Sequence, residues 1–145
     1  MNAEAKEKLV LDFKNKCRRR KLKVTPQRTA IYRELINSTD HPNVEILFKR
    51  VKKILPDISF DTVYRTLSLF YKIGVADIIE GLPATRRYDG NTNKHYHFIC
   101  QKCNKIIDIK DVPFEFRLPK KIKDNYDVKN LRVLIEGICK DCSKQ

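Results

Sequence analysis

Apolar residues recur at three- and four-residue spacing through the first half of the chain, the pattern of amphipathic helices that share a core. The first such segment runs from Ala3 to about Lys21, and its apolar positions are Leu9, Val10, Phe13 and Cys17. The next extends to about Asn37, with Thr25 as N-cap and Pro26 at the first helical position. Cys17 lies on the apolar stripe, so we interpret it as a core residue rather than a reactive thiol.

Two further helices are expected before the pattern changes. Asn43 caps a helix that ends at Leu55, before Pro56, with apolar residues at Val44, Leu47, Phe48, Val51, Ile54 and Leu55. Ser59 caps the next helix, which Gly74 terminates and which is expected to bury Phe60, Val63, Leu67 and Phe70. His41 therefore falls in a connecting loop.

After Gly74 the pattern becomes that of strands. Residues 76–80 and 85–88 flank a Gly81-Leu82-Pro83 turn and predict a β-hairpin. Three short helices and a hairpin follow one another in a winged helix-turn-helix domain, whose third helix enters the major groove of DNA. We therefore predict a DNA-binding domain over residues 1–88, followed by a hinge at residues 89–94, which are turn formers.

Residues 95–145 are expected to form a small α/β dimerisation domain. Strands are predicted at Tyr96–Cys100 and Lys105–Lys110, and a short helix over Lys120–Asn125 begins at Pro119. Alternating apolar and polar residues over Val128–Ile138 predict a last strand with one buried face. The fold class is therefore α+β, and a homodimer is expected because it would pair or cover the exposed strand edges.

A formal net charge of +13 indicates a polyanionic partner, and double-stranded DNA fits the predicted fold. A basic surface that serves only solubility is the alternative. No apolar run is long enough to span a bilayer and no signal peptide is recognisable, so we expect a cytoplasmic protein without membrane association. Thiols stay reduced in that compartment, which favours metal binding over disulfides.

Polar residues follow one face of the helix that begins at Ser59, and the predicted wing carries Arg86 and Arg87. A solvated helix face would look similar, but the winged-helix context favours contact with DNA. The basic residues Arg18–Lys21 either bind DNA phosphates or stabilise the C-terminal end of the first helix, where positive charges interact favourably with the helix dipole. The predicted DNA contacts are Arg19, Arg28, Ser59, Asp61, Thr62, Tyr64, Arg65 and Arg86.

Four of the five cysteines form two CxxC pairs, Cys100 with Cys103 and Cys139 with Cys142. Two intervening residues let one turn bring both sulfurs to one ion, so the two pairs predict a tetrahedral Zn²⁺ site. Such a site has no open coordination position, and the zinc is expected to be structural. The alternative, two redox-active pairs, requires a thioredoxin-like βαβ context that is missing.

Strand parity predicts a second metal site. Side chains alternate along a strand, so His95 and His97 face one way and Cys100 the other. If Cys100 pairs with Lys105 across the turn, His97 lies opposite Asp108. Asp89 from the hinge and His41 from the first domain can complete the site. The predicted ligands are therefore His41, Asp89, His95, His97 and Asp108, a set of nitrogen and oxygen donors that suits Fe²⁺ or Mn²⁺.

Two histidines and a carboxylate also form the facial triad of iron oxygenases. Such an enzyme needs an apolar substrate pocket, whereas this chain uses its apolar residues in the winged-helix and sheet cores. We therefore expect a DNA-binding protein rather than an enzyme.

Motifs along nearly the whole chain resemble those of the ferric uptake regulator family. They are Thr25-Pro26-Gln27-Arg28, His41-Pro42, Ser59 to Leu67, Tyr88-Asp89, His95 to Cys103 and the closing CxxC pair. The five predicted ligands match the peroxide-responsive branch, because Asp108 stands where the iron-uptake branch usually has glutamate. Two departures are Asn104, in place of a usual glycine, and the proline- and lysine-rich residues 112–123. No histidine follows His97, which argues against the additional metal site of some iron-uptake members.

The resemblance implies a homodimeric transcriptional repressor with a structural zinc and a regulatory Fe²⁺ or Mn²⁺, which binds a palindromic A/T-rich operator. It also implies that peroxide, through the bound iron, oxidises His41 and His95 and thereby releases DNA. The alternative within the family is a repressor that senses iron level by losing Fe²⁺. In either case a metal with ligands from both domains would favour a closed hinge and so set the spacing of the DNA-binding domains.

Overall fold

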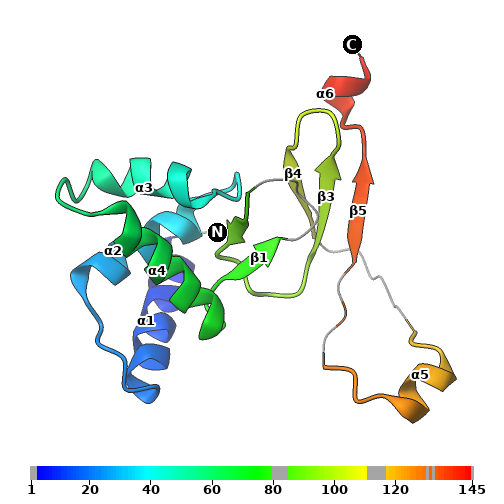
Figure 1. Ribbon diagram of the computed structural model, residues 1–145, viewed down its shortest axis with the longest axis horizontal. Coiled ribbons are helices and arrows are strands. Elements are labelled where there is room, and N and C mark those ends of the chain that lie inside the picture. Colours follow the sequence, from blue (N-terminus) through cyan, green and yellow to red (C-terminus); the bar gives the residue numbers. More distant parts are fainter. Residues whose placement is uncertain (1–2, 80–84, 111–116, 130, 132, 145) are drawn as a thin grey trace. The chain divides into compact units, whose positions relative to one another are not determined.

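The computed structural model describes residues 3–79, 85–110, 117–129, 131 and 133–144 (Figure 1). The chain separates into two compact units, Met1–Asn93 and Lys94–Gln145. The first unit contains α1 (Ala3–Arg19), α2 (Pro26–Asn37), α3 (Val44–Lys52), α4 (Phe60–Lys72), β1 (Asp77–Ile79) and β2 (Arg87–Asp89). The second contains β3 (Tyr96–Cys100), β4 (Ile106–Ile109), α5 (Lys120–Asn125), β5 (Leu134–Gly137) and α6 (Lys140–Ser143).

The helices α2, α3 and α4 begin at the predicted caps. Each cap side chain accepts a hydrogen bond from a backbone N–H three residues on: Thr25 from Arg28 at 3.2 Å, Asn43 from Ile46 at 2.8 Å, and Ser59 from Thr62 at 3.1 Å. Such a bond satisfies one of the orphan donors of the first turn and stabilises the helix by about 1 kcal/mol. Gly74 ends α4 with a φ of 68°, a left-handed conformation that favours glycine.

The core of the first unit joins the apolar faces of its four helices. Phe13 stacks on Tyr32 with ring centroids 4.5 Å apart, and Phe70 meets both rings edge-on at 5.2 and 5.6 Å. Cys17 is fully buried in the same cluster, as the apolar stripe predicted. Each fully buried large apolar side chain, such as Phe13 or Phe70, contributes about 1.5–3 kcal/mol to folding.

Two apolar positions differ from the prediction. Ile54 is 60% exposed, because α3 ends at Lys52 and helical periodicity no longer directs the residues beyond it. Phe60 is 47% exposed although it begins α4. Its ring meets Phe48 edge-on at 5.6 Å instead of entering the core. Both errors arise at helix ends, where sequence spacing is a poor guide to side-chain direction.

The strands β1 and β2 pair antiparallel, with Ile78 opposite Tyr88. The predicted turn at residues 81–83 lies outside the described residues. Asp89 is the last residue of β2 and pairs with Asp77. Helices followed by this two-stranded ribbon confirm the winged helix-turn-helix order of the first unit.

In the second unit, β3 lies between β4 and β5 (Figure 1). It runs antiparallel to β4 and parallel to β5. The register pairs His97 with Asp108, as predicted from the cysteine turn. Of the described residues in the strand expected over Val128–Ile138, those of β5, Leu134–Gly137, pair with β3. The helix α6 that carries Cys142 was not predicted.

The helix α5 has the predicted bounds and buries none of its side chains. No helix in the described parts of the chain has the length and apolarity to cross a membrane.

Candidate metal centres

The four cysteines of the CxxC motifs converge in the second unit. Their sulfur atoms all lie within 4.8 Å of one another, and Cys103 Sγ is 3.8 Å from Cys139 Sγ. Four thiolates around a zinc ion, each about 2.3 Å from the metal, stand about 3.8 Å apart at the corners of a tetrahedron. The cluster therefore fits a structural zinc, with Cys100 from the end of β3, Cys103 from the turn after it, Cys139 at the N-cap of α6 and Cys142 within α6.

Backbone N–H groups favour the thiolate form of Cys100. The N–H of Cys139 donates to Cys100 Sγ at 3.3 Å, and this bond, with one from the backbone of Cys103, lowers the pKa of Cys100 to about 6. In the metal-free cluster, hydrogen bonds with the side chains of Cys139 and Cys103 raise the pKa of Cys142 to about 12. The backbone therefore favours the thiolate of Cys100, which is the form that binds zinc.

The turn after Cys103 explains a departure from the family pattern. Asn104 has a φ of 58°, in the left-handed region, and its N–H donates to the carbonyl of Cys100 at 2.8 Å. Glycine adopts this conformation most easily, and asparagine is among the residues that tolerate it best. Asn104 can therefore replace the usual glycine without changing the turn that carries the first CxxC pair.

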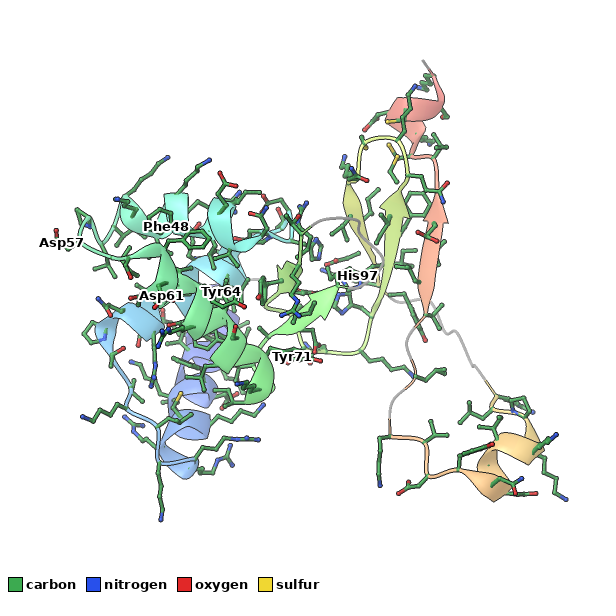
Figure 2. All side chains as sticks on the ribbon, viewed as in Figure 1. Phe48, Asp57, Asp61, Tyr64, Tyr71 and His97 are labelled. Carbon is green, nitrogen blue, oxygen red and sulfur yellow. The ribbon has the colours of Figure 1, made fainter. Side chains whose placement is uncertain are left out.

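Three of the predicted sensory ligands come together in the second unit. The Nε2 atoms of His95 and His97 are 2.9 Å apart, and each is 3.7 Å from Asp108 Oδ1. His97 projects from β3 (Figure 2), and Asp108 is its partner on β4. Two imidazole nitrogens and a carboxylate oxygen thus converge on one point, as the strand parity predicted.

The other two predicted ligands form a buried pair in the first unit. His41 is 3% exposed and Asp89 is 6% exposed, and His41 Nε2 is 3.8 Å from Asp89 Oδ2. Asp89 Oδ1 also accepts a hydrogen bond from the N–H of Asn91 at 2.7 Å. Burying an imidazole beside a carboxylate is costly unless the groups serve as ligands or form strong hydrogen bonds.

Both groups consist of nitrogen and oxygen donors without a thiolate. Such a set fits Fe²⁺ or Mn²⁺, whereas the four cysteines fit Zn²⁺. The chain therefore contains two chemically distinct types of metal-binding group.

Three predicted DNA contacts lie on the outer face of α4. Asp61, Tyr64 and Arg65 are exposed, and Figure 2 labels the first two. Arg65 Nε is 2.8 Å from Asp61 Oδ2, one helical turn away. An ion pair this exposed adds little to stability and is easily exchanged for a contact with DNA.

The remaining predicted contacts have different surroundings. The hydroxyls of Ser59 and Thr62 are 2.8 Å apart, in addition to the cap bond that Ser59 accepts. Arg28 is half-buried and donates to the carbonyl of Lys23 at 2.5 Å, whereas Arg19 and Arg86 are exposed.

Arg87 lies on β2, in the predicted wing, and its guanidinium bonds to another part of the first unit. Its Nε donates to the carbonyl of His41, and its Nη2 donates to the carbonyl of Asp40 at 2.6 Å. Sequence reasoning missed this role, although the alternation of side chains along β2 places Arg87 and Asp89 on one face.

Comparisons with known proteins identify the family. The model of the ferric uptake regulator family matches residues 19–136. The peroxide-responsive repressor PerR of Staphylococcus epidermidis is 36% identical over 126 residues, which cover 86% of this chain and 83% of that protein. The Campylobacter jejuni peroxide stress regulator is 28% identical, with a TM-score of 0.63 over 81% of this chain and 89% of that chain. The Helicobacter pylori ferric uptake regulator shares the fold, with a TM-score of 0.80 at 24% identity over 97% of this chain and 95% of that one. The chain therefore belongs to the ferric uptake regulator family, whose members are metal-responsive transcriptional regulators that bind DNA and dimerise.

Proposed function

We propose that this protein is a metal-dependent repressor that senses peroxide through iron-catalysed oxidation of its own histidine ligands. The observation that carries the proposal is the ligand chemistry. One candidate ligand set consists of three imidazoles and two carboxylates without a thiolate, and it differs chemically from the cysteine cluster, which fits a structural zinc. The similarity to peroxide-responsive repressors supports the same function.

The five nitrogen and oxygen ligands are proposed to bind a single Fe²⁺ or Mn²⁺, with His41 and Asp89 from the first unit and His95, His97 and Asp108 from the second. Three ligands leave coordination positions open, and the buried pair can fill them. Only residues 90–94 separate Asp89 from His95, so the tether between the two groups spans at most about 20 Å. This short tether keeps the first group at high effective concentration near the second.

The metal site would couple the stimulus to DNA binding. A metal that takes ligands from both units binds best when they are held together, and its differential affinity favours that arrangement. In a homodimer this arrangement sets the spacing of two winged domains on a palindromic, A/T-rich operator, with α4 in the major groove and Arg86 of the wing on the backbone. Loss of the metal then releases the DNA.

Fe²⁺ held by these residues would supply the one-electron reduction that cleaves the O–O bond of peroxide. His41 and His95 are the proposed targets. One peroxide oxygen would be transferred to a ring carbon and the other would leave as water, and the oxidised ring, whose two nitrogens are amide-like N–H groups, would be a poor metal ligand. Oxidation therefore destroys the site, whereas the four cysteines continue to hold the second unit together.

The test combines DNA affinity with mass spectrometry. A palindromic A/T-rich duplex selected from a random pool is titrated with zinc-loaded protein in the presence of Fe²⁺ or Mn²⁺, before and after peroxide. We expect peroxide to release DNA only from the Fe²⁺ form and to add oxygen to peptides that contain His41 or His95. DNA release without such an adduct would overturn histidine oxidation, and release on iron depletion with no release by peroxide would favour the iron-level sensor.

A further inference from the structure

We propose that Arg87 is a positioning residue for the regulatory metal ligand His41, because it holds the loop that carries the imidazole in its binding conformation before the metal arrives. This inference rests on the proposed metal site, and it concerns residues that all belong to the first unit.

The guanidinium of Arg87 holds two consecutive carbonyl groups. Its Nε donates to the oxygen of His41 and its Nη2 to the oxygen of Asp40, at 2.6 Å for the second bond. The next residue on β2, Tyr88, donates its N–H to the carbonyl of Pro42 at 3.0 Å. Three successive carbonyls of the loop are therefore fixed by two neighbouring residues of one strand.

This restraint matters because His41 has an unfavourable backbone conformation. Its φ of 49° lies in the left-handed region, which residues with a Cβ atom rarely adopt. Without an external restraint the loop would spend most of its time in other conformations. Metal affinity falls in proportion to the fraction of protein that is ready to bind, so the restraint raises that affinity.

A second arginine braces the same loop from α3. Arg50 donates to both carboxylate oxygens of Asp40, at 2.9 and 2.6 Å, and to the hydroxyl of Ser38 at 3.0 Å. Arg50 of α3 thus holds the carboxylate of Asp40, and Arg87 of β2 holds its backbone carbonyl.

The strand β2 also aligns the two ligands of the first unit. Arg87 and Asp89 are two residues apart and lie on the same face of the strand. Arg87 holds the backbone of His41, and the carboxylate of Asp89 is 3.8 Å from its ring. One face of one strand therefore determines both the position of the His41 backbone and the separation between the two ligands.

The experiment measures Mn²⁺ affinity of the full-length, zinc-loaded protein. Arg87→Gln removes the charge and the two-carbonyl contact, and we expect Mn²⁺ to bind about tenfold more weakly. Arg33→Gln is the matched control, because Arg33 also donates two hydrogen bonds but to Glu7 on α1. We expect this control to change Mn²⁺ affinity by less than about twofold. Zinc content and the thermal midpoint of the zinc-loaded protein without Mn²⁺ report whether each variant is folded.

A double-mutant cycle separates positioning from general destabilisation. If Arg87 acts through His41, Arg87→Gln has no further effect on Mn²⁺ affinity in a His41→Ala protein. An equal loss in both backgrounds, or no loss in either, would overturn the inference. Should Arg87→Gln not fold, Arg87→Lys retains one donor, and we expect a smaller loss that likewise disappears with His41→Ala. If His41→Ala itself leaves Mn²⁺ affinity unchanged, the proposed metal site fails, independently of Arg87.

Discussion

His97 and Asp108 lie directly opposite each other on β3 and β4, with His97 Nε2 3.7 Å from Asp108 Oδ1. His95 Nε2 lies at the same distance from that oxygen. The sheet register thus places the carboxylate of Asp108 opposite His97, and His95, directly before β3, reaches the same oxygen. Because backbone hydrogen bonds set this register, the geometry of His97 and Asp108 depends on the sheet rather than on a flexible loop.

Asp108→Asn should weaken Mn²⁺ binding while zinc is retained. The amide keeps the size of the side chain but removes the negative charge that neutralises the ion. Since mutations of residues that merely support ligands already cost about 10–100-fold in metal affinity, we expect a loss of at least about tenfold. Titration of the zinc-loaded protein with Mn²⁺ measures it. Asp127→Asn is the control, because Asp127 pairs with exposed Lys129 in the same unit. Equal affinities of the wild type and Asp108→Asn would exclude Asp108 as a ligand.

His41→Ala should leave zinc and dimerisation intact and remove the metal dependence of operator binding. The imidazole comes from the unit that contains α4, so its loss would uncouple the proposed metal site from DNA binding. Gel shifts with and without Mn²⁺, together with zinc analysis and sedimentation, test this expectation. Undiminished activation by Mn²⁺ in the variant would refute the coupling.

Zinc affinity should rise with pH, with a change of slope near the pKa of Cys100. Thiols must lose their protons to bind zinc. Each cysteine that is protonated in the free protein therefore releases one proton on binding and adds one to the slope of the logarithm of zinc affinity against pH. Backbone hydrogen bonds lower the pKa of Cys100 to about 6, and above that pH this residue has no proton to release. We expect the slope of the logarithm of affinity against pH to decrease by about one between pH 5 and 7. Competition with a chromophoric chelator measures it. A constant slope over this range would show that the pKa of Cys100 does not lie near 6.

Arg65→Gln should weaken operator binding, and the salt dependence will show what Arg65 contacts. A bidentate contact to a base is worth about 1–3 kcal/mol of discrimination, whereas loss of a phosphate contact lowers the salt slope by about one and weakens all sequences alike. Gel shifts at several salt concentrations, with operator and scrambled duplexes, distinguish the two contacts. Arg33→Gln again serves as the control, since Arg33 pairs with Glu7. If Arg65→Gln binds both duplexes as the wild type does, α4 does not read DNA through this residue.

Alkaline pH should destabilise the first unit through Tyr32. Burial against Phe13 and Phe70 raises the pKa of Tyr32 to about 12, above its ordinary value of 10. The folded state therefore favours the protonated phenol, and the stabilisation, fully present below pH 10, is lost as the pH rises from about 10 to 12. Urea unfolding followed by circular dichroism at several pH values measures this loss. Tyr32→Phe replaces the phenol with a ring that has no ionisable group, so its free energy of unfolding should depend less on pH. An unchanged pH dependence in this variant would show that another group causes the loss of stability.

Local features of the chain were predictable where short-range chemistry determines them. The caps Thr25, Asn43 and Ser59 were identified because a side-chain oxygen meets an N–H three residues away, whatever surrounds the helix. The opposition of His97 and Asp108 followed from a tight turn between Cys100 and Lys105, since a turn fixes the pairing of the strands that flank it. The zinc-binding cysteines were identified by the same short-range reasoning.

Other features required the tertiary structure. The parallel pairing of β5 with β3, which brings Cys139 to Cys100, joins segments separated by more than thirty residues, and no local pattern encodes such a pairing. The exposure of Phe60 and Ile54 depends on how the ends of α3 and α4 meet the core. The role of Arg87 depends on a loop forty-six residues earlier in the chain.

The sequence by itself thus predicted the candidate metal ligands by residue type and spacing, and it determined where the helices begin and how β3 and β4 pair. Only the tertiary structure decided how the ligands are held, as with the left-handed conformation of His41 between Arg87 and Arg50. The physical reason is range. Caps, turns and strand parity act over a few residues, whereas a long arginine side chain can bond any carbonyl that the fold brings near it.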